Sequence, residues 1–196
     1  MSNKQEQFEA FFQVDEANRV NLYPVSFTEV PIDQDKLELS IPPLFRLANE
    51  VNELSVSVLR PLRNLGDVAE ELATYLQAQS RKIDLIMSHI LATETPEEDA
   101  EYCDSYGGGG LRVTLPTAYP IGQYFRTKLF LQHEASAIFC FTEVIATTTK
   151  DQGTQHTLVF ARIRESDQEL VVRASLHAQT RQLKKRQLDK KDPQNS

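Results

Sequence analysis

Hydrophobic and polar residues alternate with a period of two in several short stretches, a pattern typical of β-strands with one buried face. The alternating stretches are 19–30, 111–115 and 125–131, and nearly continuous apolar runs follow at 137–146 and 157–163. Pro24 lies within the first stretch, and because proline has no backbone N–H to donate, we expect a bent or edge strand there. Several short strands joined by turns, one of them at Gly153, predict a small antiparallel barrel or sandwich.

Between residues 44 and 92 the period changes to three and four, which places aliphatic side chains in one stripe along a helix. Pro61 and Gly66 interrupt the stripe, so we expect a break or kink between them. Asp67 and Glu70 form a capping box, from which a second helix should run to about residue 92. The stripe consists of Leu44, Leu47, Val51, Leu54, Val58, Leu65, Val68, Leu72, Leu76, Gln79, Ile83, Ile86 and Ile90.

This stripe predicts a self-association surface. Each buried Leu or Ile contributes ~1.5–3 kcal/mol, so leaving the whole stripe in water would cost more than association does. We expect copies of the chain to cover it in a coiled-coil-like homo-oligomer, in which the polar Gln79 selects the register and the number of subunits. The alternative is that the stripe packs onto its own domain or folds back as a helical hairpin.

The remaining pattern completes the predicted organisation. Ser166 and Glu169 form a capping box that predicts a helix over 167–188, with basic residues near its end. The expected units are residues 1–43, a first strand and connector; 44–92, the helical insert; 93–188, the rest of the β domain and the C-terminal helix; and 189–196, a disordered tail.

Composition excludes several classes of protein. The chain of 196 residues has a formal net charge of −7, which argues against a nucleic-acid partner. No apolar run reaches the ~18 residues that span a bilayer, and the N-terminus lacks a signal-peptide pattern. Cys103 and Cys140 are the only cysteines, and they form no disulfide framework. We therefore expect a cytoplasmic protein without membrane insertion.

No motif for catalysis or metal binding stands out. The four histidines are isolated, and no spacing typical of a metal site or of an activated nucleophile occurs. We expect a protein that is not an enzyme, with Cys103 or Cys140 as a nucleophile the remaining enzymatic alternative. The four glycines at 107–110 are either a flexible turn or a grip for an anionic ligand through backbone amides.

Three segments carry a resemblance to a known family. They are DSYGGGGLRVTLP, PIGQYFRTKLFL and LVFARIRESDQELVVRASLHAQ. In this order they resemble the PilZ domain family, in which a Ser/Gly-rich turn enters a strand, a Pro-x-Gly turn leads to the next strand, and a strand ending near Phe-x-x-Ile runs into a C-terminal helix. The opening FFQVDEANRVNLYPV looks like the first strand of a subgroup with a heptad-patterned helical insert. The resemblance implies an α+β fold, an antiparallel β-barrel with a C-terminal helix and a long coiled-coil-like insert.

Typical members of that family bind the bacterial second messenger cyclic di-GMP through Arg-x-x-x-Arg and [Asp/Asn]-x-Ser-x-x-Gly. This sequence departs from both motifs. Before the first strand only Arg19 is available, and Gln13 stands where related sequences often carry arginine. Aligning Ser105 with the motif serine puts Cys103 in the acidic or amide position, and the other alignment puts Gly107 in place of serine.

The resemblance therefore implies an atypical member of the family. It would be an oligomeric, non-enzymatic adaptor without a cofactor, acting through a protein partner in cyclic di-GMP-linked regulation of motility, attachment or biofilm. The alternative is a true cyclic di-GMP receptor with non-standard arginines. Its ligand-binding residues would be Arg19, Ser105, Gly107, Gly108, Arg112 and Arg162.

Overall fold

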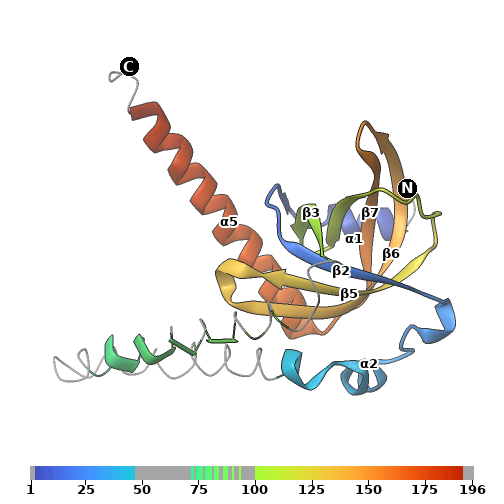
Figure 1. Ribbon diagram of the computed structural model, residues 1–196, viewed down its shortest axis with the longest axis horizontal. Coiled ribbons are helices and arrows are strands. Elements are labelled where there is room, and N and C mark those ends of the chain that lie inside the picture. The colour runs from blue at the N-terminus through green and yellow to red at the C-terminus, as the bar shows by residue number, and fades with distance from the viewer. Residues whose placement is uncertain are drawn as a thin grey trace.

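The computed structural model describes residues 3–46 and 100–191, together with isolated positions between 72 and 93. Its centre is an antiparallel β-barrel (Figure 1). Six strands follow one another in the order β3, β2, β5, β6, β7, β4, and pairing of β3 with β4 closes the ring, while the short β1 pairs with β3. The strands are β1 (Gln13–Val14), β2 (Arg19–Val25), β3 (Glu101–Gly107), β4 (Gly110–Leu115), β5 (Tyr124–Leu131), β6 (Ser136–Lys150) and β7 (Gly153–Arg162). The predicted α+β fold with an antiparallel barrel is confirmed.

Pro24 lies in a part of β2 where its missing backbone N–H breaks the fewest inter-strand hydrogen bonds. The strand β2 pairs with β5 from Val20 to Val25, but β3 reaches only Arg19 and Val20 of its other edge. Pro24 therefore lies in a section with a single neighbour, as the edge position predicted for it requires.

The barrel interior is filled by the residues that alternate along the strands. On β6, for example, Ile138, Cys140 and Val144 belong to the same buried cluster as Phe125 and Leu129 of β5. The C-terminal helix α5 (Glu165–Lys191) packs on this cluster through the buried residues Leu170, Val171, Ala174 and Ala178.

A second buried cluster lies on the outer face of β5 and β6. Phe130, Phe139 and Phe141 form its base, and Phe45 packs on the first two rings with centroids 6.0 and 6.1 Å apart. Helix α2 (Gln34–Ser40) covers it with Leu37, and Ile41 follows directly. Because β6 is buried on both faces here, its sequence is continuously apolar instead of alternating.

Two short helices were not predicted. The connector at 31–43, expected without structure of its own, contains α2, whose N-terminus is capped by the Asp33 carboxylate accepting from Lys36 N at 2.9 Å. Helix α1 (Asn3–Glu9) precedes the barrel, with Phe8 buried. Lys4 Nζ on α1 is 2.6 Å from Glu143 Oε1 on β6.

Helix α5 is longer than the predicted 167–188. Gln168 N donates to Arg164 O at 2.9 Å, so the helix begins directly after Arg164 and the predicted cap at Ser166 is inside it. The Arg164 guanidinium instead binds the buried Asp167 carboxylate at 2.9 and 3.0 Å. At the other end the helix includes residues 189–191, which were expected in the tail. Its C-terminal half projects away from the barrel (Figure 1).

Candidate functional site

The four glycines form the tight turn between β3 and β4, and all four are buried. Gly110 has a φ of +152°, a conformation that side chains rarely adopt. A Cβ at Gly108 would overlap with the Phe11 ring and come within 2.5 Å of Val172, and a Cβ at Gly109 would meet the backbone of Phe8. The glycines therefore permit close approach of the N-terminal segment and of α5, and the protein's own residues occupy the outside of the turn.

Hydrogen bonds hold this turn in place. Gln168 Nε2 of α5 donates to Gly108 O at 2.8 Å, and Phe160 N of β7 donates to Gly109 O at 3.1 Å. Gln7 Nε2 of α1 donates to Phe160 O at 3.2 Å. The turn thus joins the N-terminal segment, the barrel and the C-terminal helix.

Two of the predicted arginines flank β3. Arg19 lies on β2 and Arg112 on β4, where it pairs with Ser105. Arg19 is 5.3 Å from the centroid of the Phe130 ring, and Arg112 is 5.1 Å from that of the Phe8 ring. Ser105 is buried, and its Oγ has no hydrogen-bond partner among the residues that the structure describes.

The third predicted arginine, Arg162, binds the backbone of the connector. Arg162, at the end of β7, donates from Nε to Pro31 O at 3.0 Å and from Nη2 to Ile32 O at 3.3 Å. Its guanidinium therefore ties the connector to the barrel. Arg19 and Arg112 therefore lie on the two strands beside β3, whereas Arg162 is bound to the connector.

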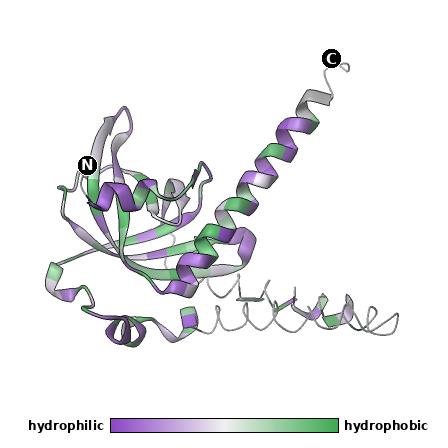
Figure 2. Cartoon of the chain, turned by 180° about the vertical axis from the view of Figure 1, so that it is seen from behind, coloured by the Kyte–Doolittle hydropathy of each residue, from purple (hydrophilic) through white to green (hydrophobic). Residues whose placement is uncertain are grey.

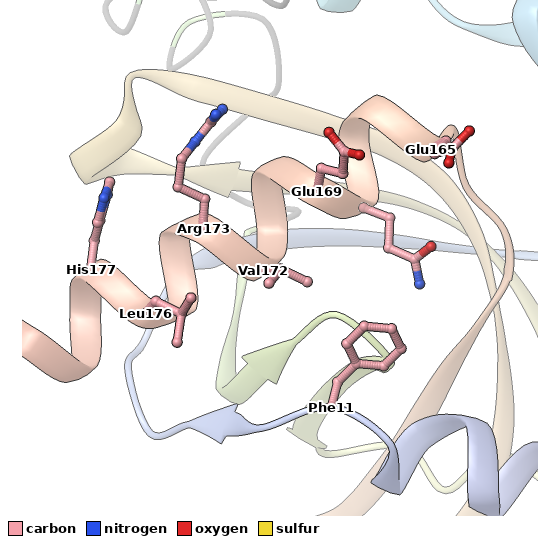
Figure 3. Close-up of a pocket in the computed structure, with 8 residues that line it drawn as sticks. Phe11, Glu165, Glu169, Val172, Arg173, Leu176 and His177 are labelled. Atoms are coloured by element: carbon pink, nitrogen blue, oxygen red, sulfur yellow. The ribbon is translucent and has the colours of Figure 1, made fainter.

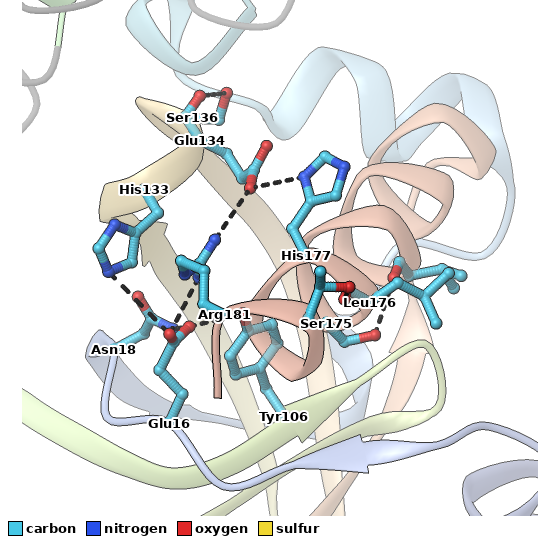
Figure 4. Close-up of polar contacts among 12 residues, drawn as sticks. Glu16, Asn18, Tyr106, His133, Glu134, Ser136, Ser175, Leu176, His177 and Arg181 are labelled. Carbon is cyan, nitrogen blue, oxygen red and sulfur yellow. Dashed lines mark hydrogen bonds and ion pairs between the residues drawn. The ribbon is translucent and has the colours of Figure 1, made fainter. Parts of the chain in front are cut away.

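A network of charged side chains fastens α5 to the rim of the barrel (Figure 4). Arg181 Nη2 donates to Glu16 Oε1 at 3.0 Å, and its Nη1 is 4.0 Å from Glu134 Oε1. Glu134 also lies 3.1 Å from His177 Nδ1. No local sequence pattern indicates this network, because Glu16 and Arg181 are 165 positions apart. We call Glu16, Glu134, His177 and Arg181 the α5 latch.

Glu16 is the half-buried centre of the latch. It also accepts from the phenol of Tyr106 at 2.9 Å. Burial by itself raises the pKa of Glu16, but the hydrogen bonds from Arg181 and Tyr106 outweigh it and leave the pKa below its ordinary value. Burial, together with this bond to a carboxylate, raises the pKa of the Tyr106 phenol. Glu16 is therefore ionised at neutral pH and binds the Arg181 cation.

An open groove of about 460 Å³ runs along α5, beside the segment that leads from α1 to β1. Figure 3 shows Val172 and Leu176 on the side of Phe11, and Glu169, Arg173 and His177 in a row that points away from that ring. Glu165 lies at the N-terminal end of the helix. The groove therefore combines an apolar floor with charged side chains along one flank.

Comparison with known proteins settles the fold. No protein-family model matches the sequence, and no curated protein matches it. Among solved structures, a protein from Xanthomonas campestris described as a new tetrameric PilZ domain self-assembled via a helical bundle superposes with a TM-score of 0.52. The two chains are 16% identical over 88% of this chain and 89% of the other. The chain has a PilZ-like fold.

A second structural match is partial. The Bacillus subtilis inhibitor of motility, MotI/DgrA, matches at 23% identity with a TM-score of 0.39, over 47% of this chain and 46% of the other.

Outside the PilZ-like barrel, the structure describes only part of the predicted oligomer interface. Leu44 packs against the second buried cluster of its own chain. Leu72, Ile83, Ile86 and Ile90 are 48%, 45%, 59% and 39% exposed, so the barrel of their own chain does not cover them. Leu76 and Gln79 are partly buried, and Gln79 Nε2 donates to Tyr75 Oη at 2.8 Å. The other predicted interface residues, Leu47, Val51, Leu54, Val58, Leu65 and Val68, lie outside the described residues.

Met87 links the insert to the barrel. It is buried in the second cluster, together with Phe130 and Phe139. Met87 is one residue from Ile86, and successive residues on a helix point about 100° apart. One side of the insert at this level therefore faces the barrel, while Ile86 beside it is 59% exposed.

The cysteines lack the properties of nucleophiles. Both are buried free thiols. Burial raises the pKa of Cys103 to about 11 and raises that of Cys140 as well, so at neutral pH both are protonated. Within the described part of the chain no group of three or more metal-binding side chains occurs, and no helix is both long and apolar enough to cross a bilayer.

Proposed function

We propose that this chain is a non-enzymatic, cytoplasmic adaptor that self-associates through its helical insert and presents PilZ-like barrels to a protein partner. The regulation it serves would be linked to cyclic di-GMP, with motility, surface attachment or biofilm as the output. The observation that carries the proposal is the exposure of Leu72, Ile83, Ile86 and Ile90, which are spaced for one helix face yet uncovered by their own barrel.

Burial energetics support association at this face. Covering an exposed Leu or Ile gains ~1.5–3 kcal/mol, so a few such residues on each of several helices offset an association cost of ~4–15 kcal/mol. The solved structure from Xanthomonas campestris is described as a tetramer self-assembled via a helical bundle. A bundle of the same kind, built from this insert, would remove the exposed face from water.

The attachment of the insert to the barrel supports the adaptor role. Because Met87 is anchored in the second cluster, a bundle formed by Ile83 and Ile86 would hold the barrels close to it. Several identical barrels held together bind a repeated or oligomeric partner more tightly than one barrel does.

Light scattering of the full chain tests the proposal. We expect the wild type to have the mass of an oligomer and Ile86→Asp to have a lower mass, because a carboxylate cannot be buried in the bundle. Ile32→Asp is the matched control, since Ile32 is a 74% exposed isoleucine on the connector. A monomeric wild type, or an Ile86→Asp variant with unchanged mass, would contradict this proposal.

A second candidate function is direct reception of cyclic di-GMP. The placement of Arg19 and Arg112 on the two strands beside Ser105 favours it, because paired guanidiniums bind phosphates and stack on guanine. The surroundings of the glycine turn argue against cyclic di-GMP binding there, because Phe8 and Phe11 already pack on Gly108 and Gly109.

Calorimetric titration of the full chain with cyclic di-GMP separates the two functions. A receptor requires micromolar binding that Arg112→Ala weakens, while Arg162→Ala, which changes a guanidinium bound to the connector, leaves it intact. Absence of heat at millimolar nucleotide would leave the adaptor as the better account.

A further inference from the structure

Helix α5 is held to the barrel as far as Gln182 and continues beyond it as a projecting end. Gln182 Nε2 donates to the backbone oxygen of Asp15 at 2.7 Å, so this residue still binds the rim of the barrel. Residues 183–191 continue the helix past this contact, and every side chain from 183 to 188 is exposed (Figure 1). At 1.5 Å per residue, this end of the helix is roughly 13 Å long. We call residues 183–191 the α5 tip.

The α5 tip is strongly basic, whereas the rest of the chain is acidic. Its sequence, LKKRQLDKK, has five basic residues and one acidic residue, a net charge of +4. Because the whole chain has a formal net charge of −7, the rest of the chain has −11. Three of the basic residues, Lys184, Lys185 and Arg186, lie in the exposed part, where Figure 2 shows hydrophilic positions with single hydrophobic ones. Positive charge is therefore concentrated at one end of the molecule.

Stabilisation of the helix does not account for these three cations. A basic side chain interacts favourably with the helix dipole only within the last turn. Lys184, Lys185 and Arg186 lie before the last turn of α5, which ends at Lys191. Successive residues on a helix point about 100° apart, so the three side chains span about 200° around the axis. The cations therefore surround the tip instead of forming one face, which suits contact between the end of the helix and an extended charged surface.

We propose that the α5 tip binds the surface of an anionic lipid membrane, to which the helix presents its end. Each basic residue near such a surface strengthens binding by about fivefold, so three cations together contribute about a hundredfold. Leu183 and Leu188 are 51% and 64% exposed, and they can enter the region of the head groups while the long lysine side chains keep their charges at the phosphates. This partner goes beyond the proposed function, which concerns self-association and a protein partner.

The acidic barrel does not prevent this binding at physiological ionic strength. Salt screens the interaction between exposed charges over a Debye length of ~8 Å. The tip extends roughly 13 Å beyond Gln182, so its end lies more than one Debye length from the rim of the barrel. A membrane in contact with the end of the helix is therefore attracted by the tip and only weakly repelled by the barrel.

A nucleic acid fits these observations less well. Single strands are bound by aromatic side chains that stack on the bases, and residues 179–191 contain no aromatic residue. A helix that reads duplex DNA places one face along a groove, whereas the cations of the α5 tip lie on several sides. A flat surface with many mobile charges has no such requirement.

Self-association would strengthen binding to a membrane. In the oligomer proposed above, several tips belong to one particle, and once one tip has bound, the others reach the same surface at a high effective concentration. This gain rests on the proposed function, whereas the attraction of a single tip does not.

Cosedimentation of the full chain with lipid vesicles tests the proposal. The probes are vesicles of phosphatidylcholine alone and vesicles that contain about one-third phosphatidylglycerol, an anionic lipid. At about 0.1 M salt we expect the wild type to sediment with the anionic vesicles only, and about 0.5 M salt should release it. The double variant Lys184→Glu/Lys185→Glu should bind the anionic vesicles at least about 30-fold more weakly, because two attractive charges are lost.

Lys36→Glu/Lys150→Glu is the matched control, since both lysines are exposed and the net charge changes by the same amount. It should bind the anionic vesicles as the wild type does. A wild type that does not sediment with anionic vesicles, or equal losses in the two double variants, would overturn the proposal. So would tighter binding of a labelled DNA duplex than of vesicles under the same conditions. If the wild type proves monomeric but still binds vesicles through the tip, the proposed function fails and the membrane proposal stands.

Discussion

At the scale of single residues, the buried glycines at 107–110 are where the N-terminal segment, the barrel and α5 meet. The glycine run left two alternatives, a flexible turn or a grip for an anion, and its actual surroundings decide what it does. Buried against Phe8 and Phe11, it is a close-packed junction. Contacts of this kind come from segments distant in sequence, so no local pattern reveals them.

The glycine junction gives the first prediction. Gly110→Ala should lower the free energy of unfolding by about 3 kcal/mol or more, because φ is unfavourable and the new Cβ would overlap with the carbonyl of Leu158. Gly122→Ala is the control: its φ is also positive, at +90°, but nothing lies within 4 Å, so we expect a loss of about 1–2 kcal/mol. Urea unfolding measures both, and equal losses would refute the role of packing.

A buried histidine gives the second prediction. His156 is fully buried and accepts a hydrogen bond from Tyr119 N at 2.9 Å through Nε2, so it is neutral in the fold. Burial lowers the pKa of His156 below its ordinary value near 6.5. The unfolded chain therefore binds a proton first as the pH falls, and the stability due to this group is complete above pH ~6.5 and is lost below it.

The measurement is urea unfolding between pH 5 and 8 for the wild type and His156→Gln. The wild type should lose more stability between pH 6.5 and 5 than the variant does, and the difference between the two curves isolates His156 from the other histidines. Parallel curves would mean that the pKa of His156 is the same in the folded and unfolded chain.

At the scale of elements, most strands were predicted, whereas β3 and the short helices were not. The period of two located β2, β4 and β5, because one face of each strand is buried in the barrel, and the apolar runs located β6 and β7. Helices α1 and α2 are too short to show a helical period, and α2 lies in a stretch rich in proline and acidic residues. The apolar run at 137–146 predicted a strand, but not the second cluster that covers its outer face.

The third prediction concerns that outer cover. Phe45→Ala should cost about 3–5 kcal/mol of unfolding free energy, because the ring is fully buried between Phe130 and Phe139 and its loss leaves a cavity. Leu39 on α2 is 82% exposed, so Leu39→Ala should change the free energy of unfolding by less than about 0.5 kcal/mol. Urea unfolding measures both variants. A small loss for Phe45→Ala would mean that the other side chains of the second cluster move in to fill the cavity.

At the scale of the whole molecule, the sequence predicted the parts and the structure adds how they are joined. The barrel, the insert and the C-terminal helix follow from periods of two and of three and four. The junctions, which are the glycine turn, the α5 latch and Met87 in the second cluster, depend on pairs such as Glu16 and Arg181 that no spacing connects. The set of candidate ligand residues is where the prediction and the structure differ most, because Arg162 binds the connector.

The last prediction joins stability to self-association. If folded chains associate through the insert and unfolded chains do not, mass action stabilises the fold, and the Tm should rise with protein concentration. We expect calorimetric Tm values of the wild type to rise over a hundredfold range of concentration. In Ile86→Asp the rise should be much smaller, while Ile32→Asp should behave as the wild type does. A Tm independent of concentration would mean that the exposed isoleucines of the insert do not hold folded chains together, whatever mass the native protein has.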